Sequence, residues 1–515
     1  SSLFAFVYDR LPNDTDLTVY KREGLAGLNL AFIGSAARYH TREDSLANLS
    51  RASLQHQGEN ALALVRALAE TELREPPSGR AVFFSVAGAF VLAWPLPAAP
   101  AVALLALLLV RLACHRRGGR FLPRLRALVP FLAPFVAAVA GVLAWQLLRA
   151  LGAFPVTFVP RPWASLAAAV AASLLAALPV LVAEARAAGT AVGSWERAWT
   201  STALLGLVLA LAWPETSYLL VAPALVAGGA RLALPETVSP WLPFAASGLV
   251  LLPLALFLPD ALGPVALPVV AAAFGIVFAT LPIDGTRGAW HRPVGALAAL
   301  FVAASAAALV LSKPTLDEPE HGTMLAVEEA TRSGARLAYS PASGRLHSSV
   351  AATARFEKAP GLFPWARKAA PFAAPMPSTS LPFPELTVLD SAPLPDGRRR
   401  LRLRLTSPRG APRLGLVFPD AAGVEEIRVE GQPLPSPYLR KKPAAGKPLR
   451  LFLRTAPPEG FVVELTLPAA PREAYVLDET PGLPPSATAV GRSRPATVAP
   501  SGGGDATVLF RKLSL

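Results

Sequence analysis

The sequence predicts a multi-domain membrane protein with a short α/β segment, a polytopic α-helical membrane block and a C-terminal antiparallel β domain. Its 515 residues are more than one domain usually contains. Residues 81–312 are rich in Ala, Leu, Val and Pro and carry few charges, whereas both flanking regions are ordinary or polar in composition. Such a composition is typical of a segment that is embedded in a membrane. We therefore expect three parts, at residues 1–75, 76–314 and 315–515.

The first part has the pattern of a strand followed by a helix. Residues 25–33 form a near-continuous apolar run between two glycines, as in a buried parallel strand. Residues 53–69 repeat apolar side chains at helical spacing, and Ser50 or Ser53 can cap that helix. A doubly wound sheet presents site residues in the loops at its strand ends. We therefore expect the loop between strand and helix to carry functional side chains.

The apolar block predicts about eight membrane spans. Crossing about 30 Å of hydrocarbon takes about 20 residues of helix. We place the spans at 98–114, 127–148, 163–183, 199–213, 216–232, 241–258, 264–283 and 293–312. Residues 80–94 are also apolar, and we interpret them as an extra span or an interfacial helix.

Basic residues are concentrated in alternate loops of this block. The loops at 115–126, 184–198, 233–240 and 284–292 contain Arg116, Arg117, Arg120, Arg124, Arg126, Arg186, Arg197, Arg287 and Arg292. The opposite loops contain little beyond Arg149 and Arg161. Because basic loops face the cytoplasm, we expect loop 115–126 on that side. An even number of spans then places both flanking parts on the exoplasmic side, in the periplasm or an organelle lumen.

The last part predicts an antiparallel β domain of the sandwich type. Short alternating segments separated by Pro and Gly turns are typical of such domains. These segments lie at 401–405, 413–417, 425–429, 449–453 and 462–467. Residues 359–385 and 479–504 are rich in proline, and we interpret them as linkers or loops.

The formal net charge of +14 does not indicate a nucleic-acid partner. Part of the excess lies in the basic loops of the membrane block. Much of the rest lies in alternating runs such as 398–404, which are typical of the solvent-facing side of a strand. The one cysteine, Cys114, excludes an intrachain disulfide and a thiolate zinc cluster.

Four short motifs follow one another in the first part. They read NDTDLTVYK from Asn13, GLNLAFI from Gly27, YHTRED from Tyr39 and SLQHQGEN from Ser53. In this order they resemble the closing section of the zinc aminopeptidase and glutaminyl-cyclase family, in its multi-pass membrane branch. The resemblance implies that the first part is the C-terminal piece of an α/β di-zinc peptidase domain. It also implies a polytopic membrane block and an exoplasmic C-terminal domain.

The resemblance assigns roles to four residues. His40 matches the last zinc-ligand histidine, and a neutral imidazole suits Zn²⁺. Tyr39 matches the tyrosine whose hydroxyl stabilises the oxyanion as water attacks the peptide carbonyl. Asp16 matches an aspartate that orients its neighbours by hydrogen bonding, and we expect Asp44 to fix the loop of His40 in the same way. The structural alternatives are a loop histidine at position 40 and a helix-capping aspartate at position 16.

Other histidines and acidic pairs are not expected at this site. His56 lies on the predicted helix as a packing or surface residue, and His321 and His347 are isolated in loops. The pairs Glu328-Glu329 and Glu425-Glu426 follow the membrane block and therefore lie outside the peptidase fold.

The family's pattern also needs an earlier His, a bridging Asp, an adjacent Glu-Glu pair and another Asp. A catalytic zinc needs about three protein ligands, so one histidine cannot hold the two zinc ions of a complete site. We therefore expect the printed chain to be an N-terminally truncated member of the family, and to be inactive by itself.

Three functional hypotheses remain. The first is a membrane-anchored zinc exopeptidase with aminopeptidase-like activity, whose partners are membrane lipid and a peptide substrate and whose water nucleophile is activated by metal. The second is a non-catalytic scaffold that binds a partner. The third is a transporter, which is disfavoured because the middles of the predicted spans carry no ionisable side chain.

Overall fold

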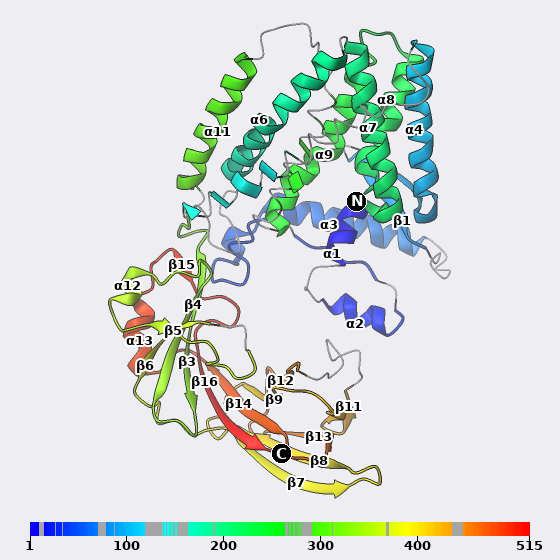
Figure 1. Ribbon diagram of the computed structural model, residues 1–515. Helices are drawn as coiled ribbons and strands as arrows, with labels where there is room; N and C mark the ends of the chain where they lie inside the picture. Colours follow the sequence, from blue (N-terminus) through cyan, green and yellow to red (C-terminus); the bar gives the residue numbers. More distant parts are fainter. Residues whose placement is uncertain are drawn as a thin grey trace. The chain divides into compact units, whose positions relative to one another are not determined.

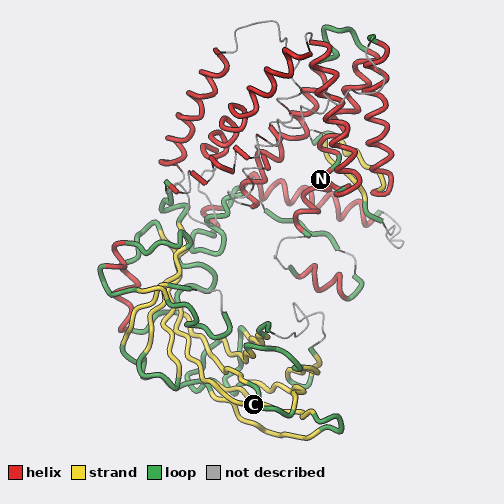
Figure 2. Tube along the Cα trace, in the orientation of Figure 1, coloured by secondary structure: helices red, strands yellow, loops and turns green. Residues whose placement is uncertain are grey.

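The chain forms two compact units, which we call the helical unit and the β unit (Figures 1 and 2). The helical unit consists of Ser1–Asp14, Leu30–Ala36 and Ser50–Lys313, and the β unit of Thr15–Asn29, Ala37–Leu49 and Pro314–Leu515. The computed structural model describes all residues except 10–14, 26, 33, 71–78, 87, 119–135, 137–138, 141, 145, 148–149, 152–162, 189–190, 263–265, 267–268, 271–272, 275–276, 278–279, 281–290, 312, 367–369 and 435–445.

The helical unit contains the predicted membrane helices. They are α4 (Ala99–Arg116), α6 (Trp163–Ala188), α7 (Ala191–Ala212), α8 (Tyr218–Ala233), α9 (Trp241–Leu262) and α11 (His291–Leu311). Within the described residues, three helical stretches are long and apolar enough to cross a membrane: Leu96–Arg116, Trp241–Pro259 and Val294–Leu311. The chain is therefore a membrane protein. Eight spans are not supported, and the predicted spans at 127–148 and 264–283 lie largely outside the described residues.

Small residues let these helices approach closely. A Cβ added to Gly228 of α8 would lie 2.6 Å from the Leu109 Cβ and 2.8 Å from the Val110 backbone nitrogen of α4. Only glycine fits at such a contact, and close backbone approach at small residues is typical of membrane helix pairs. The opposite face of α4 exposes Leu104, Leu105 and Leu108, as expected of a surface that meets lipid.

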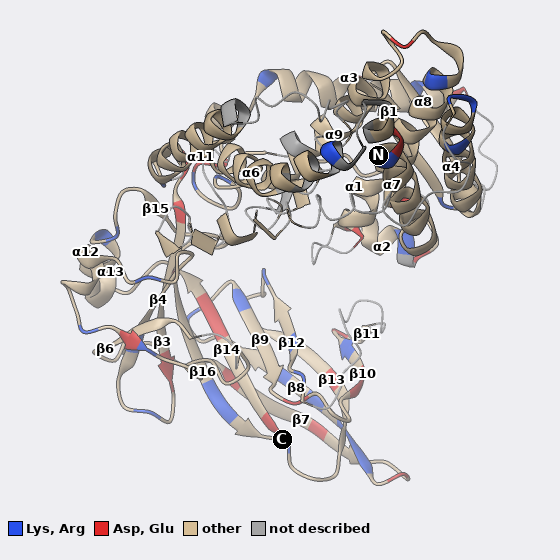
Figure 3. Ribbon diagram, turned by 45° about the horizontal axis from the view of Figure 1, so that its top comes forward, with Lys and Arg blue, Asp and Glu red and all other residues tan. Residues whose placement is uncertain are grey.

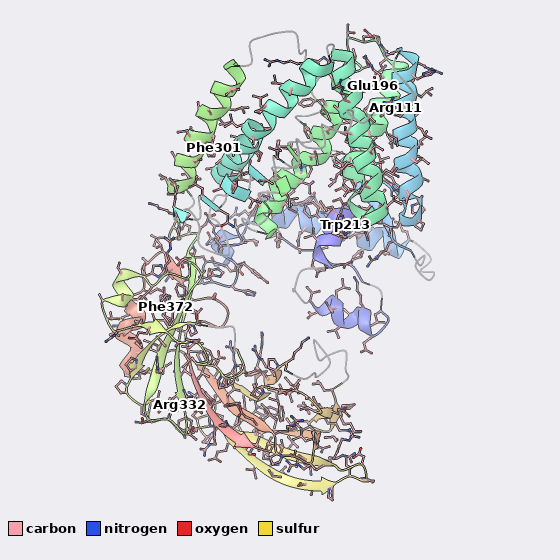
Figure 4. All side chains as sticks on the ribbon, viewed as in Figure 1. Arg111, Glu196, Trp213, Phe301, Arg332 and Phe372 are labelled. Carbon is pink, nitrogen blue, oxygen red and sulfur yellow. The ribbon has the colours of Figure 1, made fainter. Side chains whose placement is uncertain are left out.

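Buried ion pairs join one end of this bundle. Arg111 of α4 donates to Thr200 Oγ1 of α7 over 2.8 Å and lies 3.1 Å from Glu196 Oε1 (Figure 4). Arg231 of α8 is also buried and donates to Ser239 Oγ over 3.1 Å. Both arginines lie in the last two turns of their helices. Figure 3 shows Lys and Arg in blue around α4 and α8. Ionisable groups therefore do occur within the predicted spans 98–114 and 216–232, although not in their middles.

The described parts of three predicted basic loops meet at this end. Arg117, after α4, pairs with Glu236, which lies between α8 and α9. The Arg111–Glu196 pair joins α4 to the first turns of α7, which lie within the predicted loop 184–198. This arrangement agrees with the alternating charge pattern. The cytoplasmic assignment of loop 115–126 stays a prediction.

A β-hairpin occupies residues for which the sequence predicted a span or an interfacial helix. Its strands are β1 (Ala81–Val86) and β2 (Phe90–Pro95), paired from Ala81↔Pro95 to Val86↔Phe90. The helix prediction was wrong because aromatic and β-branched residues flank a turn at Gly88, whose φ of +76° favours glycine. The hairpin packs beside α1 (Ser2–Tyr8) and the turn η4 (Pro214–Thr216).

The strand predicted at 25–33 is not formed. Its described residues have no regular structure, and Leu25, Leu28, Leu30 and Phe32 are exposed. A buried parallel strand needs a hydrogen-bonded neighbour on each side. None of the described strands pairs with this segment.

The predicted helix after it is present as α3 (Arg51–Ala69), and α2 (Asp16–Arg22) precedes it. The backbone N–H of Ser53 donates to Ser50 Oγ over 3.2 Å, which confirms Ser50 as the cap. The helix does not cover a sheet, because none of its described residues is buried.

The β unit contains two sheets. One has the order β11-β10-β13-β8-β7, and the other has the order β12-β9-β14-β16-β3-β4-β6-β5 with β15 beside β3. Strand bounds are β3 Glu320–Glu329, β4 Ala335–Pro341, β5 Glu357–Lys358, β6 Phe372–Met376, β7 Glu385–Pro393, β8 Arg398–Thr406, β9 Arg413–Phe418, β10 Glu425–Val429, β11 Gln432–Pro433, β12 Leu449–Leu453, β13 Phe461–Pro468, β14 Glu473–Pro481, β15 Val498–Ala499 and β16 Ala506–Ser514.

The sheets pack face to face around an apolar core. Leu401, Leu403 and Leu405 of β8 meet Leu414 and Phe418 of β9 in that core. The sandwich prediction needs one correction, because β3 runs parallel to both β15 and β16. The Pro-rich stretches at 359–385 and 479–504 are not wholly linkers. They contain β6, β15 and the helix α13 (Pro485–Arg492).

The arginine run of β8 lies on the solvent side of its sheet, as predicted. Leucines alternate inward, while Arg400 and Arg402 are exposed. Arg402 lies 3.3 Å from Glu464 on β13, and Arg400 lies 3.5 Å from Glu426. Opposite charges across strands therefore neutralise much of this face.

The acidic pair Glu328-Glu329 has structural partners in the β unit. Glu328 accepts from the hydroxyls of Ser378 and Thr379, both over 2.6 Å. Burial alone would raise the pKa of Glu328, but these hydrogen bonds outweigh it and hold the pKa below its usual value. Glu329 lies 2.8 Å from Arg332.

His347 is not an isolated loop residue. Its Nε2 lies 3.2 Å from Glu320 Oε2, and the Tyr339 hydroxyl lies 2.7 Å from its Nδ1. Burial would raise the pKa of Glu320, but hydrogen bonds from His347 and Ser343 hold that pKa below its usual value. This network ties β3 and β4 to the start of the short helix α12 (Ser348–Ala351).

Candidate functional site

The Tyr39–His40 pair lies in a loop that local hydrogen bonds hold in shape. The Thr41 hydroxyl donates to the Arg38 carbonyl over 2.7 Å, and the Glu43 N–H donates to that hydroxyl over 3.1 Å. His40 has a φ of +60°, in the left-handed region that few non-glycine residues adopt. We call residues 37–44 the His40 loop.

The two side chains of the pair lie against each other and face solvent. Their ring centroids are 3.8 Å apart, with the planes inclined by 37°. Both residues are exposed. In such a pair the imidazole nitrogen can bind a metal ion. The neighbouring phenol hydroxyl can donate a hydrogen bond to a molecule held beside that ion.

Three contacts hold the His40 loop to the rest of the β unit. His321 at the start of β3 donates from Nε2 to the Ala37 carbonyl over 3.1 Å. The Gly502 N–H donates to the His40 carbonyl over 3.0 Å. Arg38 donates from Nε to the Asp317 carbonyl over 2.9 Å. The start of β3, the loop before it and the turn between β15 and β16 therefore hold the His40 loop on both sides of Tyr39.

Sequence reasoning missed these contacts. It placed His321 in an isolated surface loop, whereas the structure puts it on β3 against the His40 loop. A partner 284 residues away that accepts through its backbone leaves no sequence signal. The Gly-rich run at 501–504 does signal a tight turn, and Gly502 has a φ of +66°.

The two predicted aspartates do not join the pair. Asp16 is the first residue of α2, where Thr15 caps the helix, and an acidic side chain there stabilises the helix N-terminus. Asp44 is exposed, and its backbone N–H donates to the Thr41 carbonyl over 3.1 Å. Within the described residues, no hydrogen bond or ion pair joins either aspartate to Tyr39 or His40. Their orienting roles stay predictions.

The described residues do not complete a zinc site. A catalytic zinc needs about three protein ligands, and no group of three His, Cys, Asp or Glu residues capable of holding a metal occurs among them. His40 supplies one imidazole. His56 is an exposed residue of α3 whose Nε2 lies 3.3 Å from the Asn60 amide, in agreement with its assignment as a surface residue.

Comparison with known proteins identifies the segment that contains this loop. Residues 4–65 match the model of peptidase family M28. The chain is 38% identical over 90 residues to human endoplasmic reticulum metallopeptidase 1, covering 16% of this chain and 10% of the relative. It is 39% identical over 97 residues to a vacuolar membrane protease of Candida albicans, covering 19% of this chain and 11% of the relative.

A vacuolar membrane protease of Yarrowia lipolytica is 32% identical over 84 residues, covering 16% of this chain and 8% of the relative. The chain thus spans about a tenth of the length of the curated relatives that it matches. No solved structure matches it. The segment that carries Tyr39 and His40 is therefore similar to peptidase family M28, and the relatives that it matches are endoplasmic reticulum metallopeptidases and vacuolar membrane proteases.

Proposed function

We propose that this chain is part of a membrane-bound zinc metallopeptidase that removes residues from the N-termini of peptides on the exoplasmic side. The observation that carries the proposal is the exposed Tyr39–His40 pair within the M28 match. Relatives named as metallopeptidase and as membrane protease support the same reaction class. The membrane helices support the anchoring.

In this proposal each residue of the pair has its own task. His40 offers a neutral imidazole nitrogen as one zinc ligand. The Tyr39 hydroxyl donates a hydrogen bond to the oxyanion that forms on the peptide carbonyl. The described residues supply no further group of ligands that would complete this zinc site. The donor set of the described residues does not fit zinc by itself.

A non-catalytic scaffold is the second candidate. The observation that favours it is that the described residues supply a single candidate ligand at the pair. In a scaffold, the His40 loop would be a structural remnant that the β unit holds in place. Zinc content separates the two candidates, because only the enzyme needs bound metal.

The test uses the protein translated from the whole reading frame that contains this sequence, purified in lipid nanodiscs. We expect about two zinc ions per chain, as in two-metal aminopeptidases, and release of N-terminal residues from peptides. The 515-residue chain alone is the control, with neither property expected. A whole protein that folds but contains no zinc would contradict the enzyme and support the scaffold.

The contacts of the His40 loop lead to a prediction about His321. His321→Ala in the whole protein should lower zinc affinity about tenfold, the lower end of the effect of losing a residue that orients a ligand. His321→Gln should restore part of the affinity, because its amide can donate to the Ala37 carbonyl. Zinc titration with a chelating indicator measures both variants.

The matched control is His347→Ala. That histidine lies in the same unit but bonds to Glu320 and Tyr339 instead of the loop. If His321 acts only through the stability of the β unit, both alanine variants should weaken zinc binding alike. Equal losses would therefore refute the positioning role.

A further inference from the structure

We infer that the β1–β2 hairpin is a membrane-interface anchor, whose exposed apolar side chains lie in the boundary between lipid headgroups and acyl chains. The hairpin has no polar face. Residues 81–95 contain no charged side chain, and Ser85 is their one hydroxyl. A hairpin in water usually alternates apolar and polar faces, and an isolated two-stranded hairpin is marginally stable there.

One half of the hairpin is covered by the helical unit. Val82 and Phe84 are buried, and the Phe84 ring stacks on Tyr218 at 4.8 Å between centroids. The Ser2 hydroxyl links the base of the hairpin to η4 through the Phe83 and Glu215 carbonyls, at 3.2 Å and 2.7 Å. These contacts fix the hairpin at the end of α8 where that helix begins.

The other half is uncovered. Phe90, Val91 and Leu92 are 56%, 63% and 44% exposed, on both faces of the ribbon near its turn. Three adjacent large apolar residues on a strand that carries no charged side chain form a surface that water does not favour. Something apolar therefore covers this tip.

The position of the hairpin in the chain identifies that cover as lipid. The apolar span Leu96–Arg116 begins at the residue after β2 ends at Pro95. Phe90 lies six residues before Leu96, a distance of about 20 Å at most for a strand that rises about 3.4 Å per residue. The exposed tip is therefore held near the membrane surface.

The residues around the hairpin are of the kinds expected at the membrane–water interface. Trp213, which is exposed and directly precedes η4, marks the same end of the bundle (Figure 4). Tryptophans gather at the membrane–water boundary. At the base of the hairpin, Arg80 pairs with Glu215 and Asp9, at 3.3 Å and 3.5 Å. An element that lies in the plane of the membrane interface typically has charged groups beside its apolar surface, and these groups face the lipid headgroups.

The test places an environment-sensitive fluorophore on single cysteines of the intact chain in nanodiscs. Cys114, the one native cysteine, is first replaced by alanine. The probe position is Val91→Cys, and the matched control is Val388→Cys, an exposed strand valine of the β unit. We expect a blue-shifted Val91 probe that lipids spin-labelled near the headgroup quench about twofold, and an unquenched Val388 probe.

Each alternative cover gives a distinct result. A blue-shifted Val91 probe that no lipid quencher reaches would mean that protein covers the tip. Stronger quenching by labels deep in the acyl chains would mean a spanning segment. A probe with water-like emission would mean an exposed loop. Each of these three results would overturn the interfacial anchor. An added Phe90→Glu substitution should reduce quenching at Val91, because a carboxylate at the tip opposes insertion.

Discussion

Replacing His40 with alanine in the whole protein is expected to remove most of its zinc and nearly all of its peptidase activity. Residues that merely orient a ligand contribute about 10-fold to 100-fold to metal affinity. Loss of a ligand itself should cost at least about 100-fold, because the donor atom is absent and the alanine methyl cannot bind zinc. Zinc per chain, measured by mass spectrometry after dialysis, and peptide release together check the result.

The chain provides close controls for this variant. His56→Ala removes another exposed histidine 16 positions away in the same M28 match and should change neither zinc content nor activity. Tyr39→Phe should keep the zinc but lower kcat about 100-fold, as losing one oxyanion donor does. Tyr20→Phe changes an exposed tyrosine of α2 and should be neutral. A His40→Ala protein with full zinc would refute the ligand assignment.

The sequence singled out Tyr39 and His40 as candidate site residues, whose roles stay predictions, but it did not show which contacts hold their loop. Tyr39 and His40 were predicted because they lie within an ordered set of local motifs. The contact of His321 with Ala37 joins residues far apart in the chain, and its acceptor is a backbone carbonyl that any residue would supply. The Arg111–Thr200 contact is similar, since it joins positions 89 residues apart across two helices. Such contacts depend on tertiary packing, which a single sequence does not encode locally.

In the fold, too, features set by local sequence patterns were predicted, and features that depend on tertiary contacts were not. Long apolar runs predicted the helices α4, α7 and α8, because composition alone requires them to leave water. Alternation predicted β8 and its buried leucines. Residues 80–94 were misinterpreted because a continuous apolar run fits a strand and a helix equally well. The segment at 25–33 was misinterpreted because an apolar run becomes a strand only where neighbouring strands accept its hydrogen bonds.

The second large effect concerns a buried ion pair of the β unit. Asp478 on β14 accepts from Arg409 Nη2 over 2.7 Å and from the Ser407 hydroxyl over 2.6 Å. The Asp478 and Arg409 side chains are 0% and 8% exposed. Asp478→Ala would leave the Arg409 charge buried without its carboxylate, which costs about 3–5 kcal/mol of folding free energy. Hydrogen exchange of β14 and β8 peptides in the intact protein measures this loss as easier opening.

A surface pair in the same unit tests whether burial causes the effect. Glu464→Ala breaks the Arg402–Glu464 contact, whose side chains are 56% and 27% exposed, and should cost less than about 1 kcal/mol. Replacing Asp478 and Arg409 together with apolar residues should restore part of the stability that Asp478→Ala loses, because no charge is then left unpaired in the interior. If the double variant opens as easily as Asp478→Ala, the penalty comes from packing. If it opens less easily, the unpaired charge is the cause.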